Sequence, residues 1–265
     1  MWGAGGWLHN LGALDFAGGT VVHISSGVSA LVAALVLGRR LGFGQGKFEP
    51  HDATMTVLGA CLLWFGWFGF NAGSAVTAGT LATSAFVVTN TATAMAALTW
   101  MTVSWWHKRQ PSVLGAAAGA VAGLVAITPA SGFVNVMGAI VIGFGAGVVC
   151  YAAIQLRERI RVDDALDVWA VHGIGGTWGA LATGLFATVA INAGAANGLF
   201  YGNPKQALIQ LVAIGASWGW SIIGTFAILK LVNLIVPLRV QEDEEVLGLD
   251  ISQHGEPAYA GISTL

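Results

Sequence analysis

The sequence is poor in charge. Only 9% of its 265 residues are Asp, Glu, Lys or Arg, and 55% are hydrophobic; a typical soluble domain carries about 25% charged residues. So few charges cannot cover the surface of a chain of this size in water. This excludes a soluble enzyme, a disordered chain and a nucleic-acid-binding protein, and the net charge of −2 gives no preference for a polyanion. We expect an integral membrane protein in contact with the lipid bilayer.

Cysteine is scarce, and the N-terminus lacks the basic region and cleavage site of a signal peptide. The two cysteines, Cys61 and Cys150, lie in separate apolar runs, and we expect both to be small buried hydrophobic side chains. The sequence predicts no metal site and no cofactor. Either the first apolar stretch inserts directly, or Met1 is an internal residue of a longer chain.

Long apolar runs and glycine are abundant. Seven stretches qualify for the roughly 20 apolar residues with which an α-helix crosses the hydrocarbon core. The 38 glycines, many of them beside alanine, predict helices that pack closely. The fold class is therefore all-α, a polytopic membrane helix bundle with seven predicted transmembrane helices. They cover residues 16–38, 53–74, 81–106, 113–132, 134–156, 165–190 and 207–236.

The basic residues predict the orientation of these helices. They follow the first, third, fifth and seventh stretches, whereas only Lys205 lies in a loop on the opposite side and Lys230 lies within the last stretch. Because Lys and Arg are enriched in cytoplasmic loops, we expect the N-terminus outside the cell membrane and the C-terminus in the cytoplasm. The residues that mark the cytoplasmic side are Arg39, Arg40, Lys47, Lys108, Arg109, Arg157, Arg159, Arg161 and Arg239.

The chain divides into a transmembrane region, residues 1–239, and a tail, residues 240–265. The tail opens with an acidic run, Gln241 to Glu245, and continues with mixed apolar and polar residues punctuated by Gly and Pro. It is either a solvated extension or a segment that docks on a cytoplasmic partner.

Three ionisable residues in or next to the apolar stretches require an explanation, because such a group near the bilayer centre costs about 2.5–3.5 kcal/mol. Asp15 precedes the first stretch, where it can cap a helix, attract a cation or do both. His23 and His172 each follow a valine and lie beside small residues; each is either a core histidine bonded to a neighbouring helix or a functional group. Both reach roughly 10–12 Å deep from opposite faces at about 1.5 Å per residue, which allows contact without requiring it.

Aromatic residues gather in the second stretch, where residues 64–74 alternate them with glycine. Anchoring at the membrane interface explains much of the Trp content but fits this dense run poorly. Aromatic faces near Ser74 can attract a small cation through a cation–π contact worth roughly 0.5–2 kcal/mol. Phe70, just below, can plug a narrow passage.

Four segments resemble the Amt/Mep/Rh ammonium transporter family, in order along the whole chain and closest to its bacterial and archaeal Amt branch. Residues 14–24 (LDFAGGTVVHI) resemble the family signature, and residues 66–74 (GWFGFNAGS) resemble its next span. Residues 171–173 match its second pore histidine, and residues 248–256 resemble its cytoplasmic tail. The resemblance implies an eleven-helix fold assembled as a homotrimer with one pore per subunit. This chain would supply the C-terminal seven-helix portion and lack about four N-terminal helices.

The resemblance also implies a mechanism and site residues. Ammonium would be recruited outside, deprotonated and conducted as ammonia, with the proton relayed by the paired pore histidines, His23 and His172; methylammonium would be a further substrate. The protein would be a channel or transporter rather than an enzyme. Asp15, Trp2 and Ser74 would form the recruitment site, Phe70 would belong to the gate, and Trp67 would line the pore.

Partners and alternatives follow from the same resemblance. The tail would respond to PII-type signal proteins at the cytoplasmic face. An ammonium sensor acting through this tail is the alternative function, and it would need a separate signalling partner. A redox protein in which His23 and His172 bind haem is a third interpretation.

Overall fold

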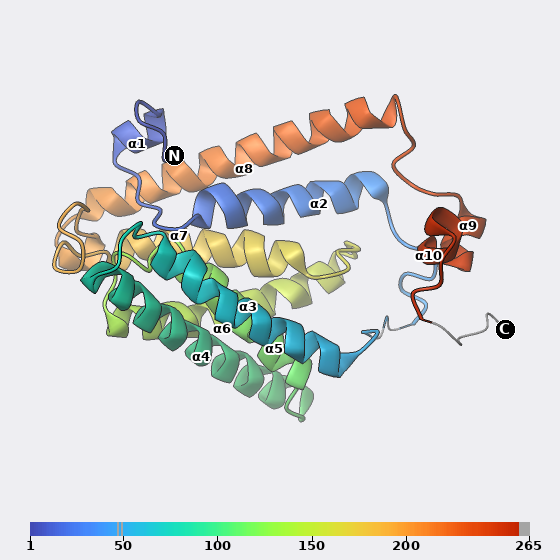
Figure 1. Cartoon of the computed structure of the whole chain (residues 1–265), viewed down its shortest axis with the longest axis horizontal. Helices are drawn as coiled ribbons and strands as arrows, with labels where there is room; N and C mark the ends of the chain where they lie inside the picture. Colours follow the sequence, from blue (N-terminus) through green and yellow to red (C-terminus); the bar gives the residue numbers. More distant parts are fainter. Residues whose placement is uncertain (47, 49, 260–265) are drawn as a thin grey trace.

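Each of the seven predicted stretches contains a long helical segment, and these segments lie side by side in one bundle (Figure 1). The computed structural model describes residues 1–46, 48 and 50–259. An all-α membrane bundle is thus confirmed. The segments are η1–α2 (Gly19–Ile24 and Ser25–Leu37), α3 (Ala53–Gly73), α4 (Thr80–Lys108), α5 (Val113–Ile127), α6 (Val136–Arg159), η2–α7 (Trp169–Ile174 and Gly175–Phe186) and α8 (Pro204–Asn233).

Among the described residues, four short helices lie outside these segments. Two follow α8 and lie in the described part of the tail, residues 240–259, at one end of the bundle (Figure 1). Residues 260–265 of the predicted tail lie outside the described residues, as does Lys47. The short helices are α1 (Trp7–Leu11), η3 (Leu199–Tyr201), α9 (Glu242–Leu247) and α10 (Leu249–His254).

Five helices of the described residues are long and apolar enough to cross a membrane. The other two predicted spans are not among them: α5 has 15 residues, and the sixth span consists of η2, with 6 residues, and α7, with 12. A helix of 15 residues is only about 22 Å long, less than the roughly 30 Å of the hydrocarbon core. The five long helices are Gly19–Leu37, Ala53–Gly73, Thr80–Lys108, Val136–Arg159 and Pro204–Asn233.

Side-chain caps begin several of these helices. Asp52 accepts the Met55 N–H at the start of α3, and Ser112 accepts the Gly115 N–H at the start of α5. The same contact occurs at α6, where Asn135 caps the first turn. Such caps satisfy first-turn N–H groups, which have no partner inside the helix and none in hydrocarbon.

Small residues bring α4, α5 and α6 into close contact, as the glycine content predicts. A Cβ atom at Gly123 of α5 would lie 2.7 Å from the Ala92 carbonyl oxygen of α4, and one at Gly143 of α6 would lie 2.3 Å from the same oxygen. Only glycine permits such an approach from both sides. These three helices form most of the largest apolar cluster, together with part of α3.

α3 is the least covered of the long helices. Its buried residues are Trp67 and Asn71, which face the bundle, while Phe65 is 77% exposed. Cys61 is exposed on this helix, whereas Cys150 of α6 is buried. The prediction that both cysteines are buried is therefore wrong for Cys61, because α3 packs along one side only.

Three of the loops rich in basic residues meet at one end of the bundle. Arg39, after α2, donates to the carbonyl of Arg161, after α6. Arg239, after α8, donates to the carbonyl of Leu37 at the end of α2. The ends of α2, α6 and α8 thus lie together on the side that the sequence predicts to be cytoplasmic.

Candidate functional site

The two histidines meet inside the bundle. The Nδ1 atoms of His23 and His172 are 3.2 Å apart, and the ring centroids are 5.3 Å apart. His23 is 2% exposed, so it exchanges little with solvent directly. The sequence left this contact open; the structure brings the two rings within hydrogen-bond distance.

Each histidine lies in a six-residue π-helical turn that continues into an α-helix. His23 lies in η1 before α2, and His172 lies in η2 before α7. Single π-helical turns are rare and occur frequently at functional sites. Neither turn was predicted from the sequence. Gly18, which has φ of +120° at the start of η1, is the one local signal of unusual backbone there.

Thr128 fixes the position and the tautomer of His23. Its hydroxyl donates to the Leu124 carbonyl at 2.7 Å and accepts from Trp67 Nε1 at 2.8 Å. Since its one hydrogen is already donated, its contact with His23 Nε2, at 3.3 Å, makes that nitrogen the donor. His23 Nδ1 then accepts, and His172 Nδ1 donates. With the hydrogen bonds assigned in this way, the Nε2 lone pair of His172 is free to accept a proton.

Thr128 was not among the site residues predicted from the sequence. It follows the glycine- and alanine-rich α5 directly as its C-cap, and nothing in its neighbourhood in sequence marks it as a histidine partner. Only the fold brings it to a residue 105 positions away.

Two aromatic residues predicted to line a pore lie against His23. The Trp67 ring stacks on His23 with centroids 5.2 Å apart and planes 18° from parallel. The Phe70 ring lies 5.9 Å from His23 and 5.4 Å from Trp67. Trp67 is buried and Phe70 is 39% exposed. The structure thus gathers Trp67, Phe70, His23 and His172 into one cluster.

Asp15 caps the turn that carries His23. Its carboxylate accepts the backbone N–H groups of Gly18, Gly19 and Thr20, and also the Thr20 hydroxyl. Four donors occupy the accepting positions of its two oxygens. Asp15 can therefore act on a cation through its charge but not as a direct ligand, and the capping interpretation describes its contacts.

The three predicted recruitment residues are only partly joined. Trp2 Nε1 donates to the Asp15 carbonyl at 2.7 Å, which holds the indole over the capped turn. The Ser74 hydroxyl donates to the Phe70 carbonyl at 2.8 Å. Within the described residues, the hydrogen bonds and aromatic contacts do not link Ser74 to Trp2 or Asp15. A vestibule shared by all three stays a prediction.

The tail is tied to the loop after α2. The Glu245 carboxylate accepts the Leu41 N–H and pairs with Arg239; both interactions lower the pKa of Glu245. In the same loop, Arg40 pairs with Asp163, which precedes η2. Burial alone would raise the pKa of Asp163, but the hydrogen bonds from Arg40 outweigh it and lower that pKa.

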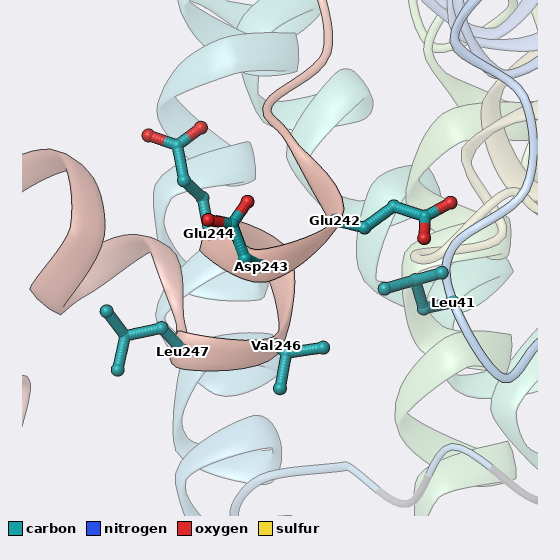
Figure 2. A pocket seen from close by; sticks show the side chains of 6 residues that line it. All are labelled: Leu41, Glu242, Asp243, Glu244, Val246 and Leu247. Atoms are coloured by element: carbon teal, nitrogen blue, oxygen red, sulfur yellow. The ribbon is translucent and has the colours of Figure 1, made fainter.

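A cavity of about 560 Å³ lies at this end of the molecule, where α9 faces the loop after α2 (Figure 2). Asp243 and Glu244 point away from Val246 and Leu247, so the surface combines negative charge with apolar area. None of its lining residues belongs to the histidine cluster. The lining residues are Leu41, Glu242, Asp243, Glu244, Val246 and Leu247.

Comparison with known sequences gives one consistent result. The model of the Ammonium Transporter Family matches residues 1–259. Ammonium transporter Amt1 of Archaeoglobus fulgidus is 52% identical over 259 residues, which are 98% of this chain and 65% of that protein. An ammonium transporter of Bacillus subtilis is 53% identical over 260 residues, 98% of this chain and 64% of that protein. The chain thus spans just under two thirds of the length of these relatives.

The chain also superposes on solved structures over most of its length. Saccharomyces cerevisiae Mep2 superposes with a TM-score of 0.86 at 41% identity, over 92% of this chain and 58% of that one. A protein described as a sensor Amt protein superposes with a TM-score of 0.84 at 31% identity, over 94% of this chain and 62% of that one.

Proposed function

The chain belongs to the Ammonium Transporter Family, and from this premise we propose that it conducts ammonium across the membrane as ammonia, with His23 and His172 relaying the proton separately. The observation that carries the proposal is the 3.2 Å contact between the Nδ1 atoms of the two rings inside a membrane bundle. Methylammonium, which also has a proton to lose, would be a further substrate.

The physical reason is desolvation. An ammonium ion that enters a narrow apolar passage loses its hydration, at a large cost in free energy. Ammonia is neutral, so giving up the proton removes most of that cost. Imidazole exchanges protons near neutral pH. As His172 Nε2 takes up the proton that ammonium gives up, the Nδ1 proton of His172 crosses to His23 Nδ1, and His23 gives up its Nε2 proton, which leaves both rings neutral. Potassium has no proton to give up, which makes the passage selective.

The surrounding residues take supporting roles in this proposal. Asp15, whose oxygens accept three backbone N–H groups and the Thr20 hydroxyl, favours a cation through its charge. Trp2 and Ser74 line the approach from outside. The Phe70 ring, 5.9 Å from His23, forms part of a gate, and Trp67 lines the pore by stacking on His23. Thr128 joins this set because it holds both Trp67 and His23.

The orientation and partners are part of the same proposal. The N-terminus lies outside the cell membrane and the C-terminus in the cytoplasm, where the basic loops gather. The working protein is a homotrimer, and a PII-type protein binds at the cytoplasmic face. The acidic and apolar cavity beside α9 supports a protein contact on the tail.

Transport is favoured over sensing by the degree of similarity. The relatives described as ammonium transporters are 52% and 53% identical to this chain, whereas the protein described as a sensor is 31% identical. The interpretation of His23 and His172 as haem ligands has no comparable support, because His23 Nε2 faces the Thr128 hydroxyl at 3.3 Å and the two rings contact each other directly.

Ammonium and potassium currents in proteoliposomes test the proposal, with wild type compared with His172→Ala. Wild type is expected to conduct ammonium and to exclude potassium. His172→Ala should lose proton-coupled ammonium current or admit potassium, by at least about tenfold in the ratio of the two currents, which corresponds to about 1.4 kcal/mol. His9→Ala, at an exposed histidine in α1, is the matched control. Unchanged current and selectivity in His172→Ala would refute the relay.

A further inference from the structure

Each histidine of the pair is followed four residues later by a glycine. His23 precedes Gly27 in α2, and His172 precedes Gly176 in α7. Residues four apart lie on the same face of a helix. Each glycine therefore lies on the face of its own segment that carries the histidine, toward the partner segment.

Gly27 touches the backbone of the turn that carries His172. A Cβ atom built on Gly27 would lie 2.0 Å from the Gly173 nitrogen and 2.8 Å from the His172 carbonyl carbon. Both obstacles are backbone atoms, so no change of side-chain rotamer can relieve them. An alanine here requires the two segments to separate by more than about 1 Å, given close packing of the interior.

Gly176 makes the reciprocal contact with the turn that carries His23. A Cβ atom built on it would lie 3.0 Å from the His23 Cβ atom, 3.0 Å from the Gly19 carbonyl oxygen and 3.1 Å from the Ile24 nitrogen. These distances are tighter than usual by only a few tenths of an ångström. An alanine here requires a much smaller shift than an alanine at Gly27.

We propose that Gly27 and Gly176 are positioning residues for the histidine pair: each lets one histidine turn rest on the glycine of the other segment, and together they set the distance between the two imidazoles. This role rests on the proposed function for its purpose, since a proton crosses between the rings only within hydrogen-bond distance. The observed separation of 3.2 Å is already long for a hydrogen bond between nitrogens. A further separation of about 1 Å removes the bond.

The reciprocity also explains why two histidines that reach into the bundle from opposite faces meet. η1–α2 and η2–α7 enter from opposite ends, and each crosses the other at its histidine turn. A side chain at either crossing point would hold the segments apart. Glycine at both points allows the backbones to touch, and the rings then face each other without any other residue reaching between them.

The test is a spectroscopic one that does not depend on transport. The full chain, labelled with ¹⁵N-histidine and placed in lipid nanodiscs, is examined by NMR for the scalar coupling between the two Nδ1 nuclei, which is transmitted only through a hydrogen bond. We expect this coupling in wild type, its loss in Gly27→Ala, and a weakened but measurable coupling in Gly176→Ala. Gly215→Ala, at an exposed glycine of α8 with open space around it, is the control and should keep the wild-type coupling.

The ranking of the variants decides the outcome. Wild-type coupling in both Gly27→Ala and Gly176→Ala would overturn the proposal, as would absence of coupling in wild type. If Gly27→Ala does not fold, Gly176→Ala, with its smaller shift, carries the test on its own. Transport is measured separately: intact coupling in a wild-type protein that conducts no ammonium would contradict the proposed function and leave the positioning role standing.

Discussion

Replacing Asp15 with Asn distinguishes a role in attracting a cation from a role in capping the helix, because the substitution removes the charge of the side chain and keeps its shape. If Asp15 acts mainly on a cation, Asp15→Asn should impair recruitment and leave folding intact. If it acts mainly as a cap, the variant should unfold more easily. The structure favours a large folding effect, because the carboxylate accepts four donors in a buried site.

The size of the expected loss in unfolding free energy follows from the four donors that Asp15 accepts. An asparagine keeps one accepting oxygen, which can hold the N–H groups of Gly18 and Gly19. Its NH₂ group would then face the Thr20 N–H, which loses its partner at a cost of about 1–3 kcal/mol. The two remaining hydrogen bonds also lose the strength that a charged acceptor gives them. Together we expect a loss of about 2–5 kcal/mol in the free energy of unfolding.

Unfolding in mixed micelles, followed by the fluorescence of the 11 tryptophans, measures this loss. Thr20→Val is the graded control, because it removes only the hydroxyl donor and should cost about 1 kcal/mol. A free energy of unfolding for Asp15→Asn within about 0.5 kcal/mol of the wild-type value would refute the capping role, since substitutions at ordinary surface positions have effects of that size.

Two further predictions concern Thr128 and Asp163. Thr128→Val leaves two buried N–H groups, on Trp67 and His23, without an acceptor, and each should cost about 1–3 kcal/mol in the free energy of unfolding. In a double-mutant cycle, adding Trp67→Phe should recover the part of this loss that is due to the Trp67 N–H. Fully additive effects of the two substitutions would contradict the hydrogen bond between Trp67 and Thr128. The native pKa of Asp163 is lowered, so its pair with Arg40 contributes stability above the ordinary carboxyl pKa of about 4 and loses it as the pH falls through the lowered value. Unfolding measured against pH should therefore show a smaller acid-side loss in Asp163→Asn than in wild type, and identical slopes would contradict the assignment.

Much of the fold follows from the sequence, because hydrocarbon imposes a simple rule on apolar length. Residues 53–74, predicted from composition alone, match Ala53–Gly73 closely. The sixth span was harder to define: it was predicted over 165–190 but begins at Trp169 and ends at Phe186, since Asp164 binds the Trp169 N–H and holds the start of the turn.

The site was predicted residue by residue, but not its connections. Depth in the membrane places His23 and His172 at similar levels without saying which way either ring points. Their contact depends on Gly27 and Gly176, whose approach is a property of two segments 149 residues apart at the histidines. Thr128 depends on the same kind of long-range placement. The exposure of Cys61 has the same cause: the sequence of an apolar helix does not show which of its sides is covered by other helices.

In the proposed function, ammonia and its proton both cross the membrane by way of His23 and His172. Entry of ammonia alone and entry of ammonia with its proton are distinguished in proteoliposomes that contain a pH-sensitive dye, while ammonium uptake is measured. Ammonia that enters alone takes up a proton from the lumen and raises its pH, whereas ammonia that is followed by its proton leaves the lumenal pH unchanged. We expect ammonium uptake with a steady lumenal pH in wild type. Uptake with a rising lumenal pH would contradict the relay.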